Sequence, residues 1–232
     1  MSHRNVALSA RRGYDLASSH YEAWRWYRFW RLNEAPIVRG WLASLSPGEG
    51  LDAGSGTGAY LTEIAAAGHR YVAVDVSARM LAVQREKACG FQGVLEGSVE
   101  ADLAALPLVS SRFDWVLSTR VLSHISDIRA VFREFRRVLK SGGECLISDV
   151  HPEHPYTRVS IQTDVGDIAI ETHKHPIEVL RSSIRETDGL LIRSLDEYRL
   201  SDLAWKPPPE TFGKLYLNPD KPVFFVCRVS RR

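Results

Sequence analysis

The segment Asp52–Gly58 reads DAGSGTG, with glycines at three alternating positions. This spacing is typical of the tight turn between a buried strand and the helix behind it, and we expect that helix over residues 59–67. Glycine lets the backbone bend sharply at such a turn and lets a ligand approach the main chain closely. The segment therefore predicts a strand–turn–helix unit, the building block of α/β folds.

The same unit recurs along the chain. Ser77 is a suitable N-cap for a second helix, and apolar residues with a period of 3.6 predict another helix over 127–140. Because strands that alternate with helices join through right-handed crossovers, we expect an α/β fold: a Rossmann-like, seven-stranded, mostly parallel sheet with helices on both faces. The strands after the first are expected at residues 70–76, 91–97, 113–118, 144–150, 190–195 and 223–229.

Two segments lie outside this pattern. Residues 1–45 are rich in aromatic side chains, which predict a helical lid covered on both sides. Residues 151–175 alternate apolar and polar positions around a glycine, which predicts an inserted β-hairpin before a helix over 177–187. The chain has 232 residues, the length of one ordinary α/β domain, so we expect a single domain over 1–232 that includes both segments.

Composition excludes several classes of protein. The formal net charge is only +2 and the basic residues are scattered, so no nucleic-acid partner is indicated. The N-terminal sequence has no apolar core of signal-peptide length, and no later run reaches the roughly 20 apolar residues of a membrane span. We therefore expect a soluble cytoplasmic protein that does not contact a membrane.

A second acidic residue points to the ligand of the glycine-rich turn. Asp75 ends the next expected strand, where a carboxylate can accept hydrogen bonds from both hydroxyls of a ribose. The glycine turn and Asp75 together indicate a cofactor that contains adenosine. Gly54, Gly56 and Ala59 also satisfy the dinucleotide-binding pattern G-x-G-x-x-A, so a nicotinamide cofactor is the alternative hypothesis. Asp52 argues against it, because a carboxylate there would repel a pyrophosphate but attract a cationic amino-acid group.

Three stretches of the sequence carry a family resemblance: LDAGSGTG, VAVDVSARML and FREFRRVLKSGGECLISDV. They resemble the class I S-adenosylmethionine-dependent methyltransferases of type 11, the ubiquinone-methyltransferase-like branch. The resemblance covers residues 10–150 well and the rest of the chain more loosely. It implies S-adenosylmethionine as cofactor and a direct displacement that methylates an O, N or C atom of a small molecule. Because the carboxyl ends of the strands leave this edge of the sheet open, we also expect the lid and the segment 151–175 to form a cap over the acceptor.

The resemblance also implies roles for individual residues. The turn would hold the methionine end of the cofactor, Asp75 the ribose, and the residues after the second and third strands the adenine. Tyr14 would close over the cofactor from the lid. The cofactor-binding residues implied in this way are Tyr14, Asp52, Gly54, Ser55, Gly56, Asp75, Val76, Met80, Ser98, Val99, Ser118 and Thr119.

The acceptor site is expected between the lid and the end of the fifth strand. Tyr21, His151 and His154 are the candidate catalytic residues, because methylation of an O–H or N–H group must release a proton. The density of aromatic side chains favours a flat or apolar acceptor, although such tryptophans belong to a core more often than to a pocket. His124 fits a structural turn.

The sequence leaves other functions as alternatives to small-molecule methylation. Asp149 could join His151 and His154 around a metal, but the set is an incomplete zinc shell, and no metal is expected. The Asn/Asp-Pro-Pro-aromatic signature of enzymes that methylate DNA bases is missing. A methyltransferase acting on protein or RNA and a nicotinamide-dependent oxidoreductase are the remaining alternatives. The sequence is compatible with a monomer or a homodimer.

Overall fold

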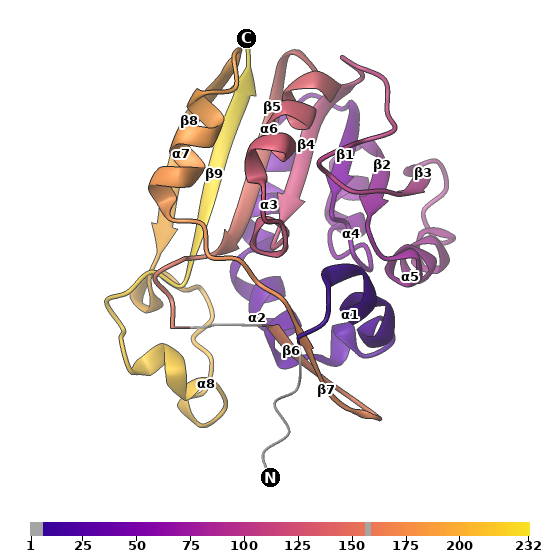
Figure 1. Ribbon diagram of the computed structural model, residues 1–232. Helices are drawn as coiled ribbons and strands as arrows, with labels where there is room; N and C mark the ends of the chain where they lie inside the picture. Colours follow the sequence, from indigo (N-terminus) through magenta and orange to yellow (C-terminus); the bar gives the residue numbers. More distant parts are fainter. Residues whose placement is uncertain (1–6, 156–158) are drawn as a thin grey trace.

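A computed structural model describes residues 7–155 and 159–232 of the chain. The described residues form one seven-stranded sheet of order β3-β2-β1-β4-β5-β9-β8 and a separate two-stranded hairpin (Figure 1). In the large sheet β9 runs antiparallel to both of its neighbours, while the other strands are parallel to one another. The predicted fold class is therefore confirmed. The strands of the sheet are β1 (Glu49–Ala53), β2 (Arg70–Asp75), β3 (Leu95–Glu100), β4 (Phe113–Thr119), β5 (Leu139–Val150), β8 (Leu190–Tyr198) and β9 (Phe224–Arg231).

Helices cover both faces of the sheet, because successive strand residues point to opposite sides. On β4, Trp115 and Leu117 belong to one apolar core together with residues of α2, α3, α4, α5 and α8, whereas Val116 belongs to a second core with residues of α6 and α7. Each face therefore has its own apolar core. The helices are α2 (Arg25–Asn33), α3 (Ala35–Ser44), α4 (Leu61–Ala66), α5 (Ala78–Ala88), α6 (Ile128–Val138), α7 (Ile177–Arg185) and α8 (Pro209–Tyr216).

The N-terminal aromatic segment is not one helix, as the sequence suggested, but three helices and a turn. Before α2 and α3 come α1 (Ala10–Ala17) and the 3₁₀ turn η1 (Tyr21–Ala23). Trp24 has an extended backbone, with φ −65° and ψ 130°, and this interrupts the helical path. The aromatic side chains then separate: Phe29 and Trp30 enter the sheet core, while Tyr14 packs on the hairpin.

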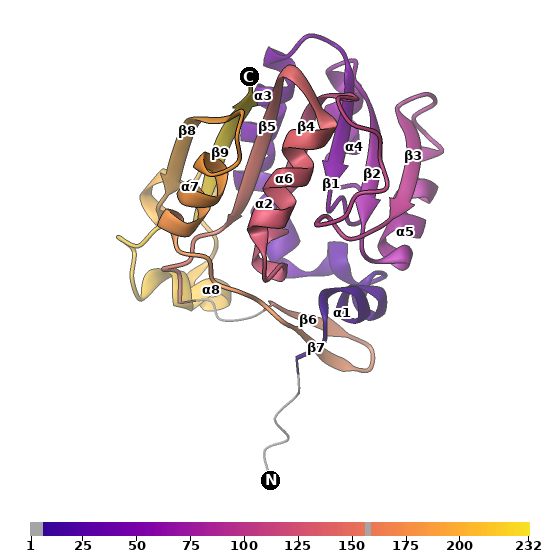
Figure 2. The same cartoon turned by 45° about the horizontal axis from the view of Figure 1, so that its top comes forward.

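The predicted hairpin is present as β6 (Val159–Thr163) and β7 (Gly166–Ile170). It packs against α1, and both lie beyond the C-terminal ends of the parallel strands (Figures 1 and 2). Leu8 bridges to Ile170, and a Cβ added to Gly13 would lie 2.6 Å from Ile170 Cγ1. The N-terminal helix and the hairpin therefore form a composite lid, although about 150 residues separate them in the sequence.

Two strands begin four or more residues away from the expected position. The third strand is Leu95–Glu100 rather than 91–97, because residues 92–94 form a turn in which Gly93 has φ +74°. The fifth strand begins at Leu139 instead of 144, directly after α6. No helix among residues 7–155 and 159–232 is both long and apolar enough to cross a membrane.

Candidate active site

A cleft opens at the C-terminal ends of β1, β2 and β4, and we call it the glycine-loop cleft. It holds about 820 Å³ of space that is open to solvent. Open α/β sheets bind their ligands at this edge. The residues that line the cleft are Ala10, Tyr14, Tyr21, Gly54, Ser55, Gly56, Ala59, Asp75, Val76, Met80, Ala101, Asp102, Leu103, Thr119, Arg120, Val121, His124 and Ile125.

The glycine loop follows β1 and has a backbone that only glycine adopts easily. Gly54 has φ +79°, and a Cβ at this position would lie 2.2 Å from Val121 Cγ2. Gly56 has φ +54°, and a Cβ there would meet nothing within 4 Å. Gly54 thus allows the loop to pack on the segment after β4, and Gly56 leaves the main chain open toward the cleft.

Asp75 ends β2 and fixes the shape of the loop. One carboxylate oxygen accepts a 2.8 Å hydrogen bond from the backbone N–H of Gly56, and the other accepts a 2.8 Å bond from Ser77 N–H. Burial raises the pKa of Asp75 to about 6, although these two N–H donors oppose that shift. Asp75 therefore orders the loop and presents a carboxylate to the cleft.

Asp52 lies at the base of the loop and is almost completely buried. Its Oδ2 atom has no hydrogen-bond partner among the described residues. Burial, together with the nearby charge of Asp75, raises the pKa of Asp52 to about 8. A buried carboxylate without a partner is costly, and a bound cation would relieve that cost.

The lid is tied to the loop by side chains that sequence reasoning did not single out. Thr57 donates a 2.6 Å hydrogen bond to Glu22 of η1, and Lys87 of α5 pairs with the same carboxylate at 2.5 Å. Ser77 donates a 2.6 Å hydrogen bond to Asp15 of α1. These contacts hold the lid over the cleft.

A second cavity, which we call the aromatic chamber, adjoins the glycine-loop cleft. It holds about 460 Å³, and the two cavities share Tyr14, Tyr21, Arg120 and His124. A molecule in the chamber would therefore face a molecule in the cleft. The chamber is lined by Tyr14, Tyr21, Trp24, Trp26, Trp30, Arg120, Ser123, His124, Asp149, Val150, His154, Val159 and Val223.

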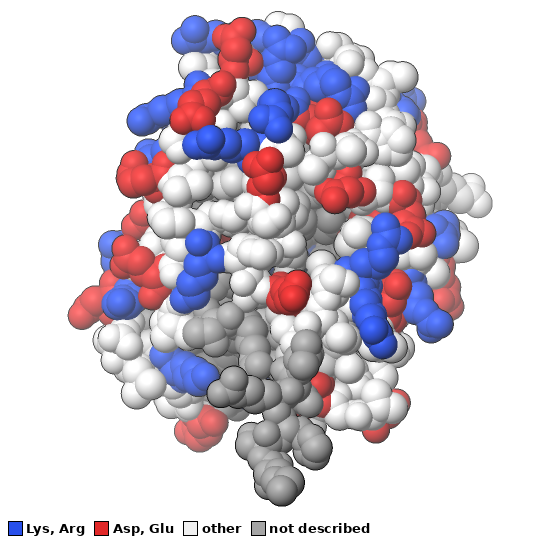
Figure 3. Space-filling model, viewed as in Figure 1, with Lys and Arg blue, Asp and Glu red and all other residues white. Residues whose placement is uncertain are grey.

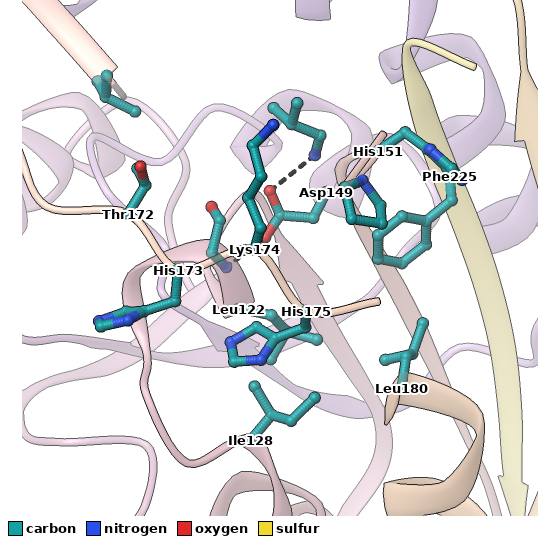
Figure 4. A pocket seen from close by; sticks show the side chains of 14 residues that line it. Leu122, Ile128, Asp149, His151, Thr172, His173, Lys174, His175, Leu180 and Phe225 are labelled. Atoms are coloured by element: carbon teal, nitrogen blue, oxygen red, sulfur yellow. Dashed lines mark hydrogen bonds between the residues drawn. The ribbon is translucent and has the colours of Figure 1, made fainter. Parts of the chain in front are cut away.

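The two histidines after β5 lie in different places. His154 lines the aromatic chamber, as expected, and burial with the nearby Lys174 lowers its pKa to about 4. His151 instead lines a third cavity, of about 560 Å³, where it lies beside Phe225 (Figure 4). There its Nδ1 accepts a 3.2 Å hydrogen bond from Glu153 N–H. The sequence predicted both histidines near the acceptor, but the structure brings only His154 to the chamber.

A buried ion pair supports the floor of the chamber. Glu34, between α2 and α3, is fully buried and accepts hydrogen bonds from Arg120, Tyr60 and Ser148. The Arg120 guanidinium lies 5.4 Å from the centre of the Trp30 ring. Sequence reasoning missed this network because its members are far apart in the chain and belong to no local motif.

Several predicted cofactor contacts are displaced from the cleft. Ser98 and Val99 lie inside β3 rather than after it, since the strand begins later than expected, and neither lines the cleft. Asp52 and Ser118 are buried and also absent from the lining, whereas Thr119 belongs to it. Asp102, which follows β3, lines the cleft although the sequence did not single it out.

The described part of the chain has no second site built from charged or metal-binding side chains. Within residues 7–155 and 159–232, no group of three or more His, Cys, Asp or Glu side chains could hold a metal ion. Figure 3 shows acidic side chains among the basic ones over the face that carries the lid. This distribution matches the small net charge of the sequence.

Known proteins are similar to this chain in sequence and in fold. Residues 51–147 match the model of the methyltransferase domain family. The demethylmenaquinone methyltransferase of Tropheryma whipplei (strain Twist) is 29% identical over 167 residues, which are 68% of each chain. A crystal structure of an S-adenosylmethionine-dependent methyltransferase from Mesorhizobium loti has a TM-score of 0.65 at 21% identity and covers 85% of this chain and 96% of its own. Geranyl diphosphate C-methyltransferase from Streptomyces coelicolor A3(2), solved with Mg²⁺, geranyl diphosphate and S-adenosyl-L-homocysteine, has a TM-score of 0.65 at 13% identity, over 86% and 80%.

The fold, the cleft and these matches define the class of the protein. It is an S-adenosylmethionine-dependent methyltransferase with a Rossmann-like sheet. Within that class, residues 51–147, from β1 to the middle of β5, match the methyltransferase domain family. The predicted cofactor is thereby confirmed, and the nicotinamide alternative is set aside.

Proposed function

We propose that the enzyme transfers the methyl group of S-adenosylmethionine to an O, N or C atom of a small aromatic or apolar molecule held in the aromatic chamber. The observation that carries this proposal is the shared wall of the two cavities, which includes Tyr14, Tyr21 and Arg120. An acceptor in the chamber is held against the cofactor, and such positioning supplies much of the rate of a displacement. The Tropheryma whipplei relative is also named for a small-molecule acceptor.

The residues of the glycine-loop cleft fit the cofactor. Asp75 suits the ribose hydroxyls, and Val76 and Met80 suit the adenine. Asp52 is not among the lining residues, but its buried Oδ2 atom suits a cationic ammonium group. Tyr14, Gly54, Ser55, Gly56 and Thr119 complete the predicted set that lines the cleft. The bound cofactor supplies a methyl group activated by the sulfonium charge. We further propose a cytoplasmic monomer or homodimer that uses no nucleic acid.

Cofactor binding is expected to release close to one proton at pH 7. Asp52, with its pKa of about 8, is mostly protonated in the free protein, and a bound cation stabilises the carboxylate. Asp75, with its pKa of about 6, is already mostly ionised and contributes little. Calorimetry in buffers of different ionisation enthalpy measures this release. The Asp52→Asn variant is the control and should release far less, and equal heats in all buffers would contradict the assignment.

The proposed function is tested in two steps. Calorimetry should show binding of S-adenosylmethionine and S-adenosylhomocysteine but not of NAD. The enzyme is then incubated with methyl-labelled S-adenosylmethionine and a metabolite extract, and the labelled product is identified. A labelled small molecule supports the proposal, whereas label found only in protein or RNA supports the alternative methyltransferase.

The aromatic chamber should control turnover. We expect Tyr21→Phe and His154→Ala to lower turnover at least about tenfold, or ~1.4 kcal/mol of transition-state stabilisation, because both residues line the chamber. Tyr27→Phe is the matched control, since Tyr27 packs on Tyr21 at 5.8 Å but lines neither cavity. Initial rates and cofactor affinity are measured together. Full turnover in both chamber variants would show that the acceptor binds elsewhere.

A further inference from the structure

We propose that His124, acting through the hydroxyl of Tyr14, takes up the proton that an O–H or N–H acceptor loses when it is methylated. This inference rests on the proposed function, because it requires an acceptor in the aromatic chamber. It also changes the role of His124, which the sequence suggested to be a structural turn residue.

The hydrogen bonds of His124 fix which ring nitrogen carries hydrogen. Nδ1 lies 2.8 Å from the backbone oxygen of Glu171, and a carbonyl oxygen can only accept, so Nδ1 is the donor. In the neutral ring, Nε2 is then an acceptor, and it lies 2.8 Å from the hydroxyl oxygen of Tyr14. Tyr14 therefore donates to His124. The lone pair of the imidazole therefore points at the hydroxyl group of Tyr14, a residue that lines both cavities.

The position of the pair suits a proton acceptor. Tyr14 and His124 are two of the four residues that line both the glycine-loop cleft and the aromatic chamber. An acceptor between the two cavities can thus meet the Tyr14 oxygen while it faces the cofactor. The lid holds this arrangement, because Tyr14 belongs to α1 and Glu171 follows β7 of the hairpin.

The transfer balances in atoms and charge. The acceptor passes its proton to the Tyr14 oxygen while the hydroxyl proton of Tyr14 moves to His124 Nε2. The acceptor's O–H or N–H bond breaks, its bond to the methyl carbon forms, and the bond between sulfur and that carbon breaks. The positive charge leaves sulfur and appears on the imidazolium of His124.

The charges around His124 favour that role over His154. Burial lowers the pKa of His124, but the buried carboxylate of Asp149 on β5 opposes this shift and would stabilise an imidazolium. The other titratable groups that face His124 are Tyr14, Tyr21, Arg120 and His173. His154 instead faces positive neighbours, Lys174 and Lys214, which disfavour a second charge.

The test uses 4-nitrophenol, a flat phenol whose phenolate has its own visible absorption band. With S-adenosylhomocysteine bound at pH 6, we expect the wild-type protein to raise the phenolate fraction of this probe about tenfold over the free probe. Nitrogen NMR on histidine-labelled protein should show His124 becoming protonated in the same sample. His124→Gln should return the phenolate fraction to that of the free probe, and Tyr14→Phe should reduce it.

His175→Gln is the control, because His175 bonds the backbone oxygen of Ile125 at 2.7 Å but lines neither the cleft nor the chamber. It should leave the band unchanged. A phenolate fraction in the wild type equal to that of the free probe, or an increase that survives in His124→Gln, overturns the proton-acceptor role. Calorimetry with S-adenosylhomocysteine separates the two proposals: no binding contradicts the proposed function itself, whereas binding without an increase in the phenolate fraction contradicts only the role of His124.

Discussion

Replacing Glu34 with alanine is expected to lower the free energy of unfolding by about 3–5 kcal/mol. The carboxylate of Glu34 is fully buried and accepts hydrogen bonds from Arg120, Tyr60 and Ser148. Its removal leaves the Arg120 guanidinium, whose side chain is only 12% exposed, without its counter-charge. Urea unfolding of the purified variant measures the loss.

Two further variants serve as controls for the loss of stability in Glu34→Ala. Glu34→Gln retains oxygen and nitrogen at the site, and it should destabilise less than alanine. Glu186→Ala removes an exposed partner of Arg129, at 3.4 Å, and should cost less than about 1 kcal/mol. A loss below about 1 kcal/mol in Glu34→Ala would mean that Arg120 finds another partner or water in the variant.

Asp75→Ala is expected to weaken binding of S-adenosylmethionine by about 2–3 kcal/mol, or roughly 30- to 150-fold. The substitution removes an acceptor for the ribose and also frees the backbone N–H groups of Gly56 and Ser77. The cofactor therefore loses both a charged contact and an ordered loop. Calorimetry with the cofactor measures the change.

Conservative and remote substitutions distinguish the two contributions. Asp75→Asn retains one acceptor oxygen and should lose only part of the affinity. Asp114→Ala is the remote control, because Asp114 lies at the opposite end of β4 and pairs with Lys140 at 2.7 Å. An unchanged dissociation constant in Asp75→Ala would remove Asp75 from the cofactor site.

The parts of the fold that the sequence predicted depend on local signals. The glycine turn, the N-cap Ser77 and the alternating hairpin residues each specify their own conformation within a few positions. The order of these elements then restricts the sheet to very few topologies. For the same reason Asp75, at a strand end beside the loop, could be assigned before the structure was known.

The missed features depend on contacts between distant residues. Tertiary packing splits the aromatic segment at Trp24, against its helical periodicity. Glu34 meets Arg120 across 86 positions, and His124 meets Glu171 across 47. No local pattern encodes such pairs. The start of β3 was predicted too early because apolar Phe91 extended the apparent strand across a turn, and Asp102, which lines the cleft, was therefore not singled out.

The place of β9 has a consequence for how the chain folds. β9 is the last strand in the sequence, yet it lies between β5 and β8 and pairs with both. Until it inserts, β5 keeps an open edge and β8 has no neighbour in the sheet. Unpaired apolar edges readily pair with other chains. During synthesis, the seven-stranded sheet can close only after β9 emerges, and aggregation of the nascent chain competes with folding until then.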